Sequence, residues 1–346
     1  MKISLVPIAA LAAALFVAPA GFGQALPASP ETAPAMREAA VQLLATLDAS
    51  QRERASFPFA DAERENWFFV PIPGQRKGLP IKEMTADQRK AAQALLRSAL
   101  SHPGYLRATG VRVLEGILGQ IENNPVYRDP ELYYVTLFGD PAGAAPWGWR
   151  FEGHHLSLNF SSVSGAVAIT PAFFGSNPAQ VLEGPFAGFR LHADEEDLAR
   201  ALLESLATDQ RALAIIDAVA PRDIISGNKR DASLERFEGI PLTRLNAEQR
   251  AMLWRLIEIY AGNARADEAA HTMERFRSAP ADSLFFAWAG SGAVGDPHYY
   301  RIHTPTMLIE YDNTQNDGNH VHSVLRDLTN DFAGDLLRRH YEQANH

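Results

Sequence analysis

The order of helical and strand-like segments constrains this chain more than any other feature of its sequence. Apolar residues recur at helical spacing in residues 36–49, 87–100, 111–121, 194–218, 247–261 and 264–276, and a last helix is expected at 328–343. Strand-like runs lie at residues 133–138, 149–160, 166–174, 284–289, 299–302, 307–312 and 320–324. Helices separate two groups of strands, without strict alternation. We therefore expect an α+β fold, with a mixed, mostly antiparallel sheet flanked by helices in a single large domain.

Residues 1–20 have the pattern of a secretory signal peptide. Lys2 precedes an apolar run over residues 5–18, and Ala18-Pro19-Ala20 supplies a small-residue cleavage site; Gly23-Gln24-Ala25 is a second candidate. The run is too short to span a bilayer comfortably, and a retained anchor is the alternative. Residues 21–35 resemble a flexible leader, so the domain is expected to comprise residues 36–346. We expect an exported protein, periplasmic or secreted.

Cysteine is absent from the chain, which excludes disulfides and thiolate ligands. Any metal must be bound by His, Asp, Glu, Asn, Tyr or backbone oxygen. The formal net charge is −9 and no long basic stretch occurs, which argues against a nucleic-acid partner. No segment after the signal peptide indicates stable membrane insertion. The expected partner is a small-molecule or peptide substrate.

Four short segments share the pattern Leu/Met-x-x-x-Gln-Arg. They begin at Leu47, Met84, Leu206 and Leu245. In the second and fourth, a Thr or Asn precedes the glutamine by three positions, which predicts a capping box at a helix start. The intervals between the segments are irregular, so they do not indicate a solenoid repeat.

Acidic and imidazole side chains are concentrated in residues 307–324. Glu310 and Asp312 are expected on one face of a strand, where two buried carboxylates need a metal, an arginine or shared protons. His320 and His322 have a spacing that directs two imidazoles to one side of a strand, as metal sites often require. Residues 313–319 predict a hairpin loop that brings both strands together. We expect Glu310, His320 and His322 to bind a metal, with Asp312 beside them; a solvated edge strand is the alternative.

Residues 149–160 are expected to form one strand, on which side chains alternate between faces. His155 then shares a polar face with Ser157 and Asn159, whereas His154 lies on an apolar face. His155 is therefore the better candidate for a fourth metal ligand or an acid–base group; a half-exposed structural histidine is the alternative. His154 is expected in the core or in the wall of a substrate pocket.

Aromatic residues and arginines precede both sets of candidate ligands. Trp149 and Arg150 lie upstream of the two histidines, and Tyr300 and Arg301 lie upstream of Glu310. These four side chains are candidates for the wall of a substrate pocket, with core packing as the alternative.

Arg326 follows the His-x-His segment and precedes Asp327 and Asp331. Its planar guanidinium suits a substrate carboxylate or phosphate, so we expect Arg326 to bind substrate. The two aspartates, one helical turn apart, are candidates for orienting the histidines, and a charged helix start is the alternative.

Other chemistries lack their motifs. There is no G-x-S-x-G elbow, no H-E-x-x-H pair and no glycine-rich phosphate loop. A glycosidase acid pair formed by Glu310 and Asp312 is disfavoured, because residues two apart on one strand lie on the same side of a sugar.

Several motifs are distinctive in combination: Leu137-Phe138-Gly139-x-Pro141, Trp147-Gly148-Trp149-Arg150-x-Glu152-Gly153-His154-His155-Leu156-Ser157, Thr170-Pro171-x-Phe173-Phe174-Gly175, Tyr299-Tyr300-Arg301-Ile302-His303, Glu310-Tyr311-Asp312 and His320-x-His322-x-x-x-Arg326-Asp327-x-x-Asn330-Asp331-Phe332. In these motifs the chain resembles the family labelled domain of unknown function 3500, which comprises mostly exported bacterial proteins and some eukaryotic relatives. The resemblance covers nearly all of the mature chain. It implies a single domain and no particular activity, so the metal hypothesis depends on the residues alone.

These residues lead to three hypotheses. The first is an exported metal-dependent enzyme with His155, Asp312 and Arg326 as catalytic residues and hydrolysis by metal-activated water. Zinc is slightly favoured over iron or copper because nothing indicates a co-substrate site, although two histidines and one carboxylate also suit an iron-dependent oxidoreductase. The second is an exported protein that binds an anionic small molecule without turnover, and the third is a structural envelope protein.

Overall fold

The structure is a computed structural model that describes residues 27–72 and 74–344. The expected signal peptide lies outside these residues. The packed chain begins before the expected boundary at residue 36, because Ser29 is buried and its amide donates to the carbonyl of Gly165. Helix α1 starts at Thr32, so residues 29–35 belong to the domain rather than to a leader. Among the described helices, none is long and apolar enough to cross a membrane.

In the described part of the first half, the chain forms four α-helices and seven strands. The helices are α1 (Thr32–Thr46), α2 (Ala49–Ala55), α3 (Ala86–Ala99) and α4 (His102–Ile121), with 3-10 turns at Ala62–Glu65 and Ile81–Glu83. The strands are β1 (Ser56–Phe57), β2 (Leu79–Pro80), β3 (Tyr134–Phe138), β4 (Trp147–Gly153), β5 (Leu156–Val163), β6 (Ala166–Ala168) and β7 (Ala172–Ser176).

Over its described residues, the second half repeats this order of elements without counterparts for the 3-10 turn Ala62–Glu65 and strand β6. Its helices are α5 (Ala193–Ser205), α6 (Thr208–Ala214), α7 (Ala247–Ala261) and α8 (Ala266–Arg277), with a 3-10 turn at Leu242–Arg244. Its strands are β8 (Ile215–Asp217), β9 (Ile240–Pro241), β10 (Phe285–Gly290), β11 (His298–His303), β12 (Met307–Asn313) and β13 (Val321–Asp327). The 3-10 turn Asp331–Ala333 and helix α9 (Gly334–Ala344) follow the repeat.

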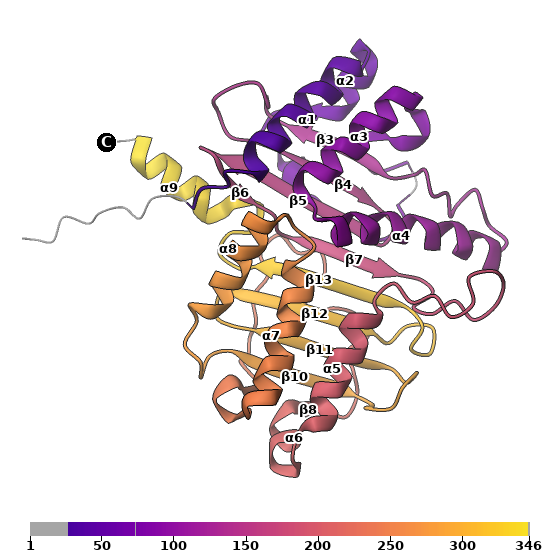
Figure 1. Cartoon of the computed structure of the whole chain (residues 1–346). Coiled ribbons are helices and arrows are strands. Elements are labelled where there is room, and N and C mark those ends of the chain that lie inside the picture. The colour runs from indigo at the N-terminus through magenta and orange to yellow at the C-terminus, as the bar shows by residue number, and fades with distance from the viewer. Residues whose placement is uncertain (1–26, 73, 345–346) are drawn as a thin grey trace, which may run out of the picture.

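All strands belong to one sheet, in the order β1-β3-β4-β5-β7-β13-β12-β11-β10-β8, with β2, β6 and β9 paired beside this path (Figure 1). Only the outermost pairs, β1 with β3 and β8 with β10, are parallel among the described strands. The expected α+β fold with a mixed, mostly antiparallel sheet is therefore confirmed. The first-half strands β1-β3-β4-β5-β7 correspond, from the edge inward, to the second-half strands β8-β10-β11-β12-β13. The two halves therefore meet where β7 pairs with β13.

Matching positions in the two halves support this internal two-fold relation. Gly139 and Gly290 both have positive φ (79° and 85°) and both lie against the carbonyl of a proline, Pro146 or Pro297. Counting on from these glycines, Arg150 of β4 corresponds to Arg301 of β11. On the helical side, a β-bridge between Leu100 and Ala264 joins the halves again.

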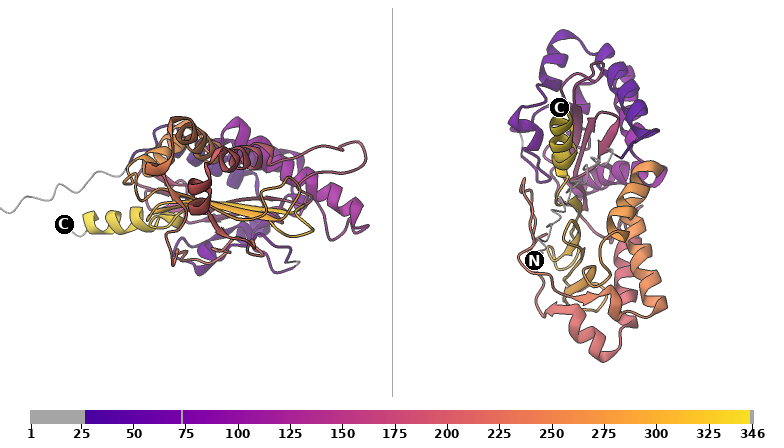
Figure 2. Two further views of the ribbon diagram at one scale, coloured as in Figure 1. Left: turned by 90° about the horizontal axis from the view of Figure 1, so that it is seen from below. Right: turned by 90° about the vertical axis from the view of Figure 1, so that its left-hand side faces the viewer.

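The two faces of the sheet differ (Figure 2). Helices cover one face, where the apolar side chains form one cluster around Trp149 and Phe151 and another around Trp288 and Ile309. Loops cover the opposite face, where a smaller cluster contains Trp67, Phe69, Phe173, Ile224, Val324 and Phe332. Polar side chains that point to the loop face must therefore find partners among loop backbone groups.

The single strand expected at residues 149–160 is instead a hairpin of β4 and β5. His154 and His155 form its tight turn, and His155 has a φ of +60°. Because His155 lies in a turn, strand alternation does not determine the direction of its side chain. The prediction that His155 shares a polar strand face with Ser157 and Asn159 was therefore wrong. The helix expected at residues 194–218 likewise divides into α5, α6 and β8.

The repeated glutamines connect helices within each half. Gln88 accepts from the amide of Thr85 and donates to the carbonyl of Thr46, at the end of α1. In the second half, Gln249 accepts from the amide of Asn246 and donates to the carbonyl of Ser205, at the end of α5. The pattern thus starts helices, as predicted, and also fixes the packing of neighbouring helices.

We expect Gln88→Ala and Gln249→Ala each to lower the free energy of unfolding by about 1–3 kcal/mol, because each removes a buried side chain that bonds a backbone amide at its own helix start and a carbonyl at the end of a neighbouring helix. Urea denaturation measures the loss. The control Lys90→Ala, on the exposed face of α3 with a side chain 79% exposed, should change stability by less than about 0.5 kcal/mol. Equal stability of Gln88→Ala and Lys90→Ala would contradict the role given to the glutamines.

Candidate metal centre

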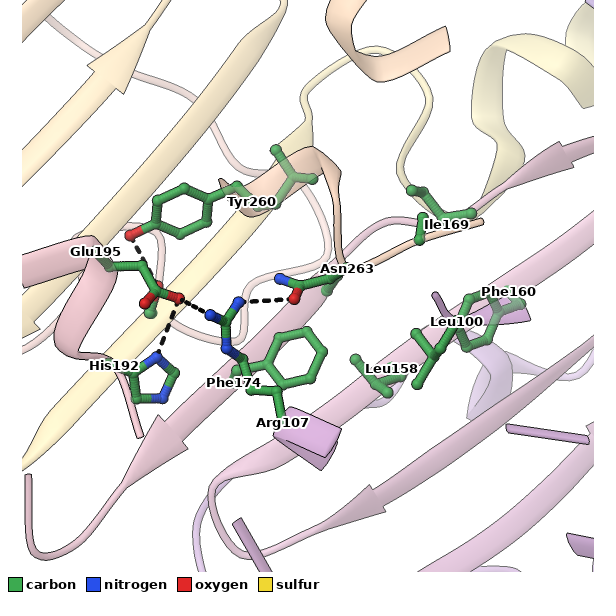
Figure 3. Close-up of a pocket in the computed structure, with 14 residues that line it drawn as sticks. Leu100, Arg107, Leu158, Phe160, Ile169, Phe174, His192, Glu195, Tyr260 and Asn263 are labelled. Carbon is green, nitrogen blue, oxygen red and sulfur yellow. Dashed lines mark hydrogen bonds and ion pairs between the residues drawn. The ribbon is translucent and has the colours of Figure 1, made fainter. Parts of the chain in front are cut away.

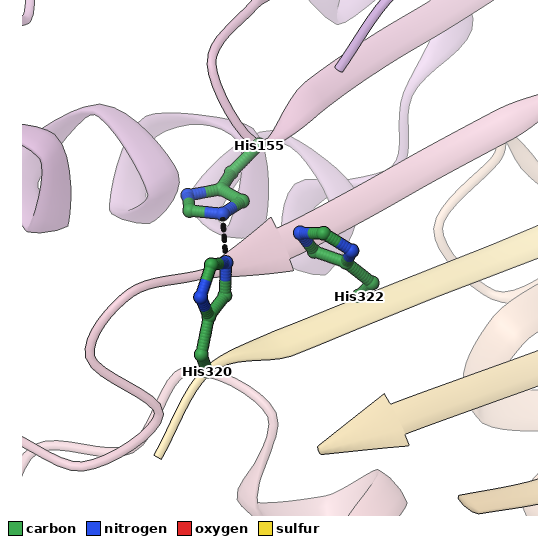
Figure 4. Close-up of side chains that lie close together, drawn as sticks. All are labelled: His155, His320 and His322. Carbon is green, nitrogen blue, oxygen red and sulfur yellow. Dashed lines mark hydrogen bonds between the residues drawn. The ribbon is translucent and has the colours of Figure 1, made fainter. Parts of the chain in front are cut away.

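Three histidines from both halves of the fold meet at one end of the β7–β13 pair (Figure 4). His155 occupies the turn between β4 and β5, His320 immediately precedes β13, and His322 lies within β13 opposite Gly175 of β7. The pairing of β7 with β13 therefore brings the first-half histidine to the two second-half histidines.

One ring nitrogen from each of these histidines lies within 4.8 Å of the others. The Nε2 atoms of His155 and His320 are 2.6 Å apart, and their rings are nearly perpendicular. The ring centroid of His322 lies 5.3 Å from that of His155 and 4.7 Å from that of His320 (Figure 4). A group of this kind could hold a metal ion, since neutral imidazole is a common ligand for transition metals.

Local backbone contacts determine the position of His155. Its amide donates to the carbonyl of Phe69, and its carbonyl accepts from the amide of Gly175. A Cβ atom at position 175 would lie 2.6 Å from the carbonyl oxygen of Val321 and 3.0 Å from Cδ2 of His155. Glycine is therefore required where the His155 turn approaches β7 and β13.

The other two histidines are also held by neighbouring groups. Nδ1 of His322 lies 2.7 Å from Oδ1 of Asp223, which leaves Nε2 for a metal. The backbone amide of His320 donates to Oδ1 of Asn313 at 2.9 Å. Phe69 and Phe173 meet the ring of His322 edge to face, so its orientation is fixed by packing as well.

A second group of possible ligands adjoins the first and shares His155. It consists of Glu115 of α4, His154 and His155. Oε2 of Glu115 lies 2.6 Å from Nδ1 of His154, and the rings of His154 and His155 have centroids 3.7 Å apart. Arg128 contacts the same Nδ1 at 3.2 Å, so a cation and a carboxylate both border His154.

Burial favours the neutral form of these imidazoles. It lowers the pKa of His155 well below its ordinary value, and the neighbouring histidines and Arg128 add to the effect. It lowers the pKa of His320 to about 3, with His322, His154 and Arg128 as further causes. The pKa of His154 is also lowered by burial, although Glu115 opposes the shift. Neutral imidazoles at neutral pH need not release a proton before they bind a metal.

Glu310 is not brought to the histidines. Its carboxylate accepts from the backbone amides of Ile225 and Ser226, and from the hydroxyl of Tyr299. The β12–β13 register explains the difference, because Glu310 lies opposite Val324 rather than opposite a histidine. In this structure Glu310 therefore holds a loop against the sheet.

Asp312 lies directly opposite His322 in the β12–β13 pair. Its Oδ1 accepts from the amide and hydroxyl of Thr314, and its buried Oδ2 has no partner in the structure. Burial raises the pKa of Asp312 to about 7; nearby Asp223 and Glu310 contribute, whereas Thr314 opposes the rise. Asp312 is thus close to the centre without belonging to either group of possible ligands.

Two of the expected substrate arginines are fully buried and hold loops. Arg150 donates to the carbonyls of Glu63 and Asn66 and pairs with the carboxylate of Glu63. Arg326 donates to the carbonyls of Lys229 and Arg230 and to the carboxylate of Asp331. Neither guanidinium is exposed to a substrate in this structure.

The expected aromatic pocket residues lie in the core. Trp149 stacks on Phe160 with ring centroids 4.3 Å apart, and Tyr300 is fully buried with its hydroxyl 2.6 Å from that of Tyr260. Of the expected wall residues, His154 adjoins the histidine centre, and Arg301 borders a separate cavity on the loop face.

Sequence reasoning missed Asp223 and Glu115, the carboxylates that contact His322 and His154. Asp223 lies in an irregular loop and Glu115 in the middle of α4, and neither position carries a local motif. It also missed a buried network beside the seam between the halves, where Glu195 contacts Arg107 and His192 (Figure 3). The cavity at this network measures about 20 Å³, which is room for about one water molecule.

Comparison with known proteins identifies the family. The family model described as "Protein of unknown function (DUF3500)" matches residues 29–334. The chain belongs to this family. No curated protein and no solved structure matches the chain. Membership in the DUF3500 family agrees with the extent of the described domain, and the chemistry must be argued from the residues.

We expect Gly175→Ala to lower the free energy of unfolding by about 1–3 kcal/mol, because the added Cβ overlaps the Val321 carbonyl. The matched control is Gly292→Ala, whose Cβ would meet only Leu203, at 3.6 Å. Urea denaturation of both variants provides the comparison. A Gly175→Ala protein as stable as Gly292→Ala would show that the His155 turn does not depend on this close approach.

Proposed function

We propose that this protein is an exported, metal-dependent hydrolase whose metal is bound by His155, His320 and His322. The observation that carries the proposal is the convergence of three imidazole nitrogens within 4.8 Å from segments far apart in the sequence. Buried neutral imidazoles that point at one another are suited to share a divalent cation, which would bind one nitrogen of each ring. Export rests on the signal-like residues 1–20.

Zinc fits the ligand set better than iron. Three histidines with an open fourth position form a catalytic zinc site, whereas non-haem iron oxygenases use two histidines and one carboxylate. Glu310, the carboxylate expected to complete the iron set, is engaged by loop amides. A zinc ion bound by three histidines lowers the pKa of a bound water to about 7, which supplies hydroxide for hydrolysis.

The neighbouring residues have distinct tasks in this proposal. Asp223 accepts from Nδ1 of His322 and holds that ring in the tautomer that presents Nε2. His154, paired with Glu115 and in contact with His155, can accept or return a proton beside the centre. Asp312 faces His322 across the strand pair and carries an unpartnered buried oxygen, so it is a second proton acceptor.

Metal content tests the ligand assignment. Protein purified without a histidine tag should contain zinc at nearly one equivalent, and His320→Ala and His322→Ala should lose it. Chelator should lower the Tm of the wild-type protein, because an ion bound only to the folded state stabilises that state. The control is His102→Ala, an exposed histidine at the start of α4, which should keep the metal. Metal-free protein whose Tm is unchanged by zinc or chelator would refute the centre.

Turnover tests the hydrolytic part. Release of nitrophenol from nitrophenyl esters and phosphoesters should follow zinc loading and fall to background in His320→Ala. Stoichiometric zinc without turnover on such a panel would favour a binding or structural role. Stoichiometric iron or copper would instead favour the oxidoreductase alternative.

Asp223→Asn should weaken zinc binding by about 10–100-fold, because an amide no longer favours the required tautomer of His322. Titration against a chromophoric chelator measures the affinity. Asp231→Asn is the matched control from the same loop, with a side chain 94% exposed, and should bind zinc as the wild type does. Equal affinities for the two variants would remove Asp223 from the site.

A further inference from the structure

The internal repeat provides a direct comparison between two buried arginines. Arg150 and Arg301 occupy corresponding positions on β4 and β11, and both point to the loop face of the sheet. Arg150 has close partners among protein oxygens, with contacts of 2.5–3.0 Å to Glu63 and Asn66 and an ion pair from Nε to Glu152 at 3.1 Å. Beside Arg301 the loop of residues 216–238 encloses a cavity.

Arg301 has weaker partners than Arg150. Its NH2 group lies 3.3 Å from the carbonyl of Arg236 and 3.5 Å from the carboxylate of Glu238, and its Nε has no partner. The residue is nevertheless only 5% exposed. His303 occupies the position that corresponds to Glu152, so the carboxylate that faces Nε in the first half is missing here. Buried charged donors without acceptors are costly, and a bound oxygen ligand removes that cost.

A cavity of about 420 Å³ adjoins Arg301. Strand residues Ala289, Tyr299 and Arg301 line it from the sheet, and the loop of residues 216–238 lines the remainder. Ser226, 4% exposed, also borders it, and its hydroxyl has no partner. Two buried polar side chains without full partners therefore border the same cavity, which has the volume of an ordinary small-molecule site.

We propose that this cavity binds a small organic acid whose carboxylate pairs with Arg301. The carboxylate supplies the oxygens that Glu63 and Glu152 supply to Arg150, and a guanidinium matches two carboxylate oxygens at once. Lys229 and Arg236 add positive charge at the rim, whereas Asp217, Asp231, Glu235 and Glu238 add negative charge. This mixture suits a single carboxylate accompanied by hydroxyl or ammonium donors, as in sugar acids and amino acids.

The proposal is independent of the metal centre, because none of the three histidines borders this cavity. Of the three arginines that were candidates for binding a substrate (Arg150, Arg301 and Arg326), the proposal assigns that task to Arg301 alone. Arg150 and Arg326 are held by loop carbonyls and carboxylates and do not line this cavity, whereas Arg301 lines it and its Nε has no hydrogen-bond partner among the described residues.

The test uses D-gluconate and L-serine as probes, with sorbitol as the neutral counterpart of gluconate and inorganic phosphate as a different anion. Isothermal titration calorimetry is carried out on full-length chelator-treated protein and on His320→Ala, so that binding to a metal is excluded. At least one carboxylate probe should bind saturably with a Kd of about 1 mM or lower. Sorbitol should not bind. The two carboxylates distinguish a sugar acid from an amino acid as the preferred class.

Two variants locate the binding. Arg301→Gln should weaken it at least tenfold. Ala232→Trp should block it by filling the cavity while leaving Arg301 in place, which keeps the test valid if Arg301→Gln is poorly folded. The proposal would be overturned if neither carboxylate binds saturably, or if sorbitol binds as well as gluconate. It would also be overturned if only phosphate binds, or if both variants keep the wild-type affinity.

Discussion

The antiparallel pairing of β7 with β13 is the interaction on which the rest of the structure depends. It joins two similar halves into one sheet and makes their central strands interior rather than exposed edges. The same pairing places Gly175 opposite His322 and thereby brings the His155 turn to the two C-terminal histidines. Stability and the candidate metal centre therefore share one set of backbone hydrogen bonds, and a change at this pair should affect both.

The loop face shows how backbone groups of loops provide partners for charged side chains buried on a sheet. Arg150 binds carbonyl oxygens of a loop and two carboxylates, Arg326 binds loop carbonyls and one carboxylate, and Glu310 binds two loop amides. Replacing one partner leaves a buried charge, which costs several kcal/mol, typically about 3–5. These residues are therefore loop anchors whose removal would unfold the loop face, and loss of activity in such variants would not by itself show a catalytic role.

Sequence periodicity was sufficient for α3, α7, α8 and the β12–β13 hairpin, but it merged α5, α6 and β8 into one helix. Residues 247–261 were predicted as a helix and form α7 with the same bounds, and the loop at 313–319 does connect two antiparallel strands. The turn at His154 and His155 was missed, because Gly and Asn, not His, are the usual residues at positive φ. The hydrogen bonds of Glu310 and Arg150 to loops could not be predicted either, because they depend on backbone groups far away in the sequence. The contact of Asp223 with His322 was missed for the same reason, since the two residues are far apart in the sequence.

The internal two-fold relation has a consequence for how such a centre can arise. A seam between like halves is an isologous interface, and in a symmetric homodimer every residue at it appears twice. Within one chain the two sides can diverge. Here the first half supplies His155 from the turn between β4 and β5, and the corresponding turn between β11 and β12 contains Pro305-Thr306 instead. The second half supplies His320, just before β13, and His322 within β13. Covalent joining of the halves thus permits a single asymmetric centre on a nearly symmetric scaffold.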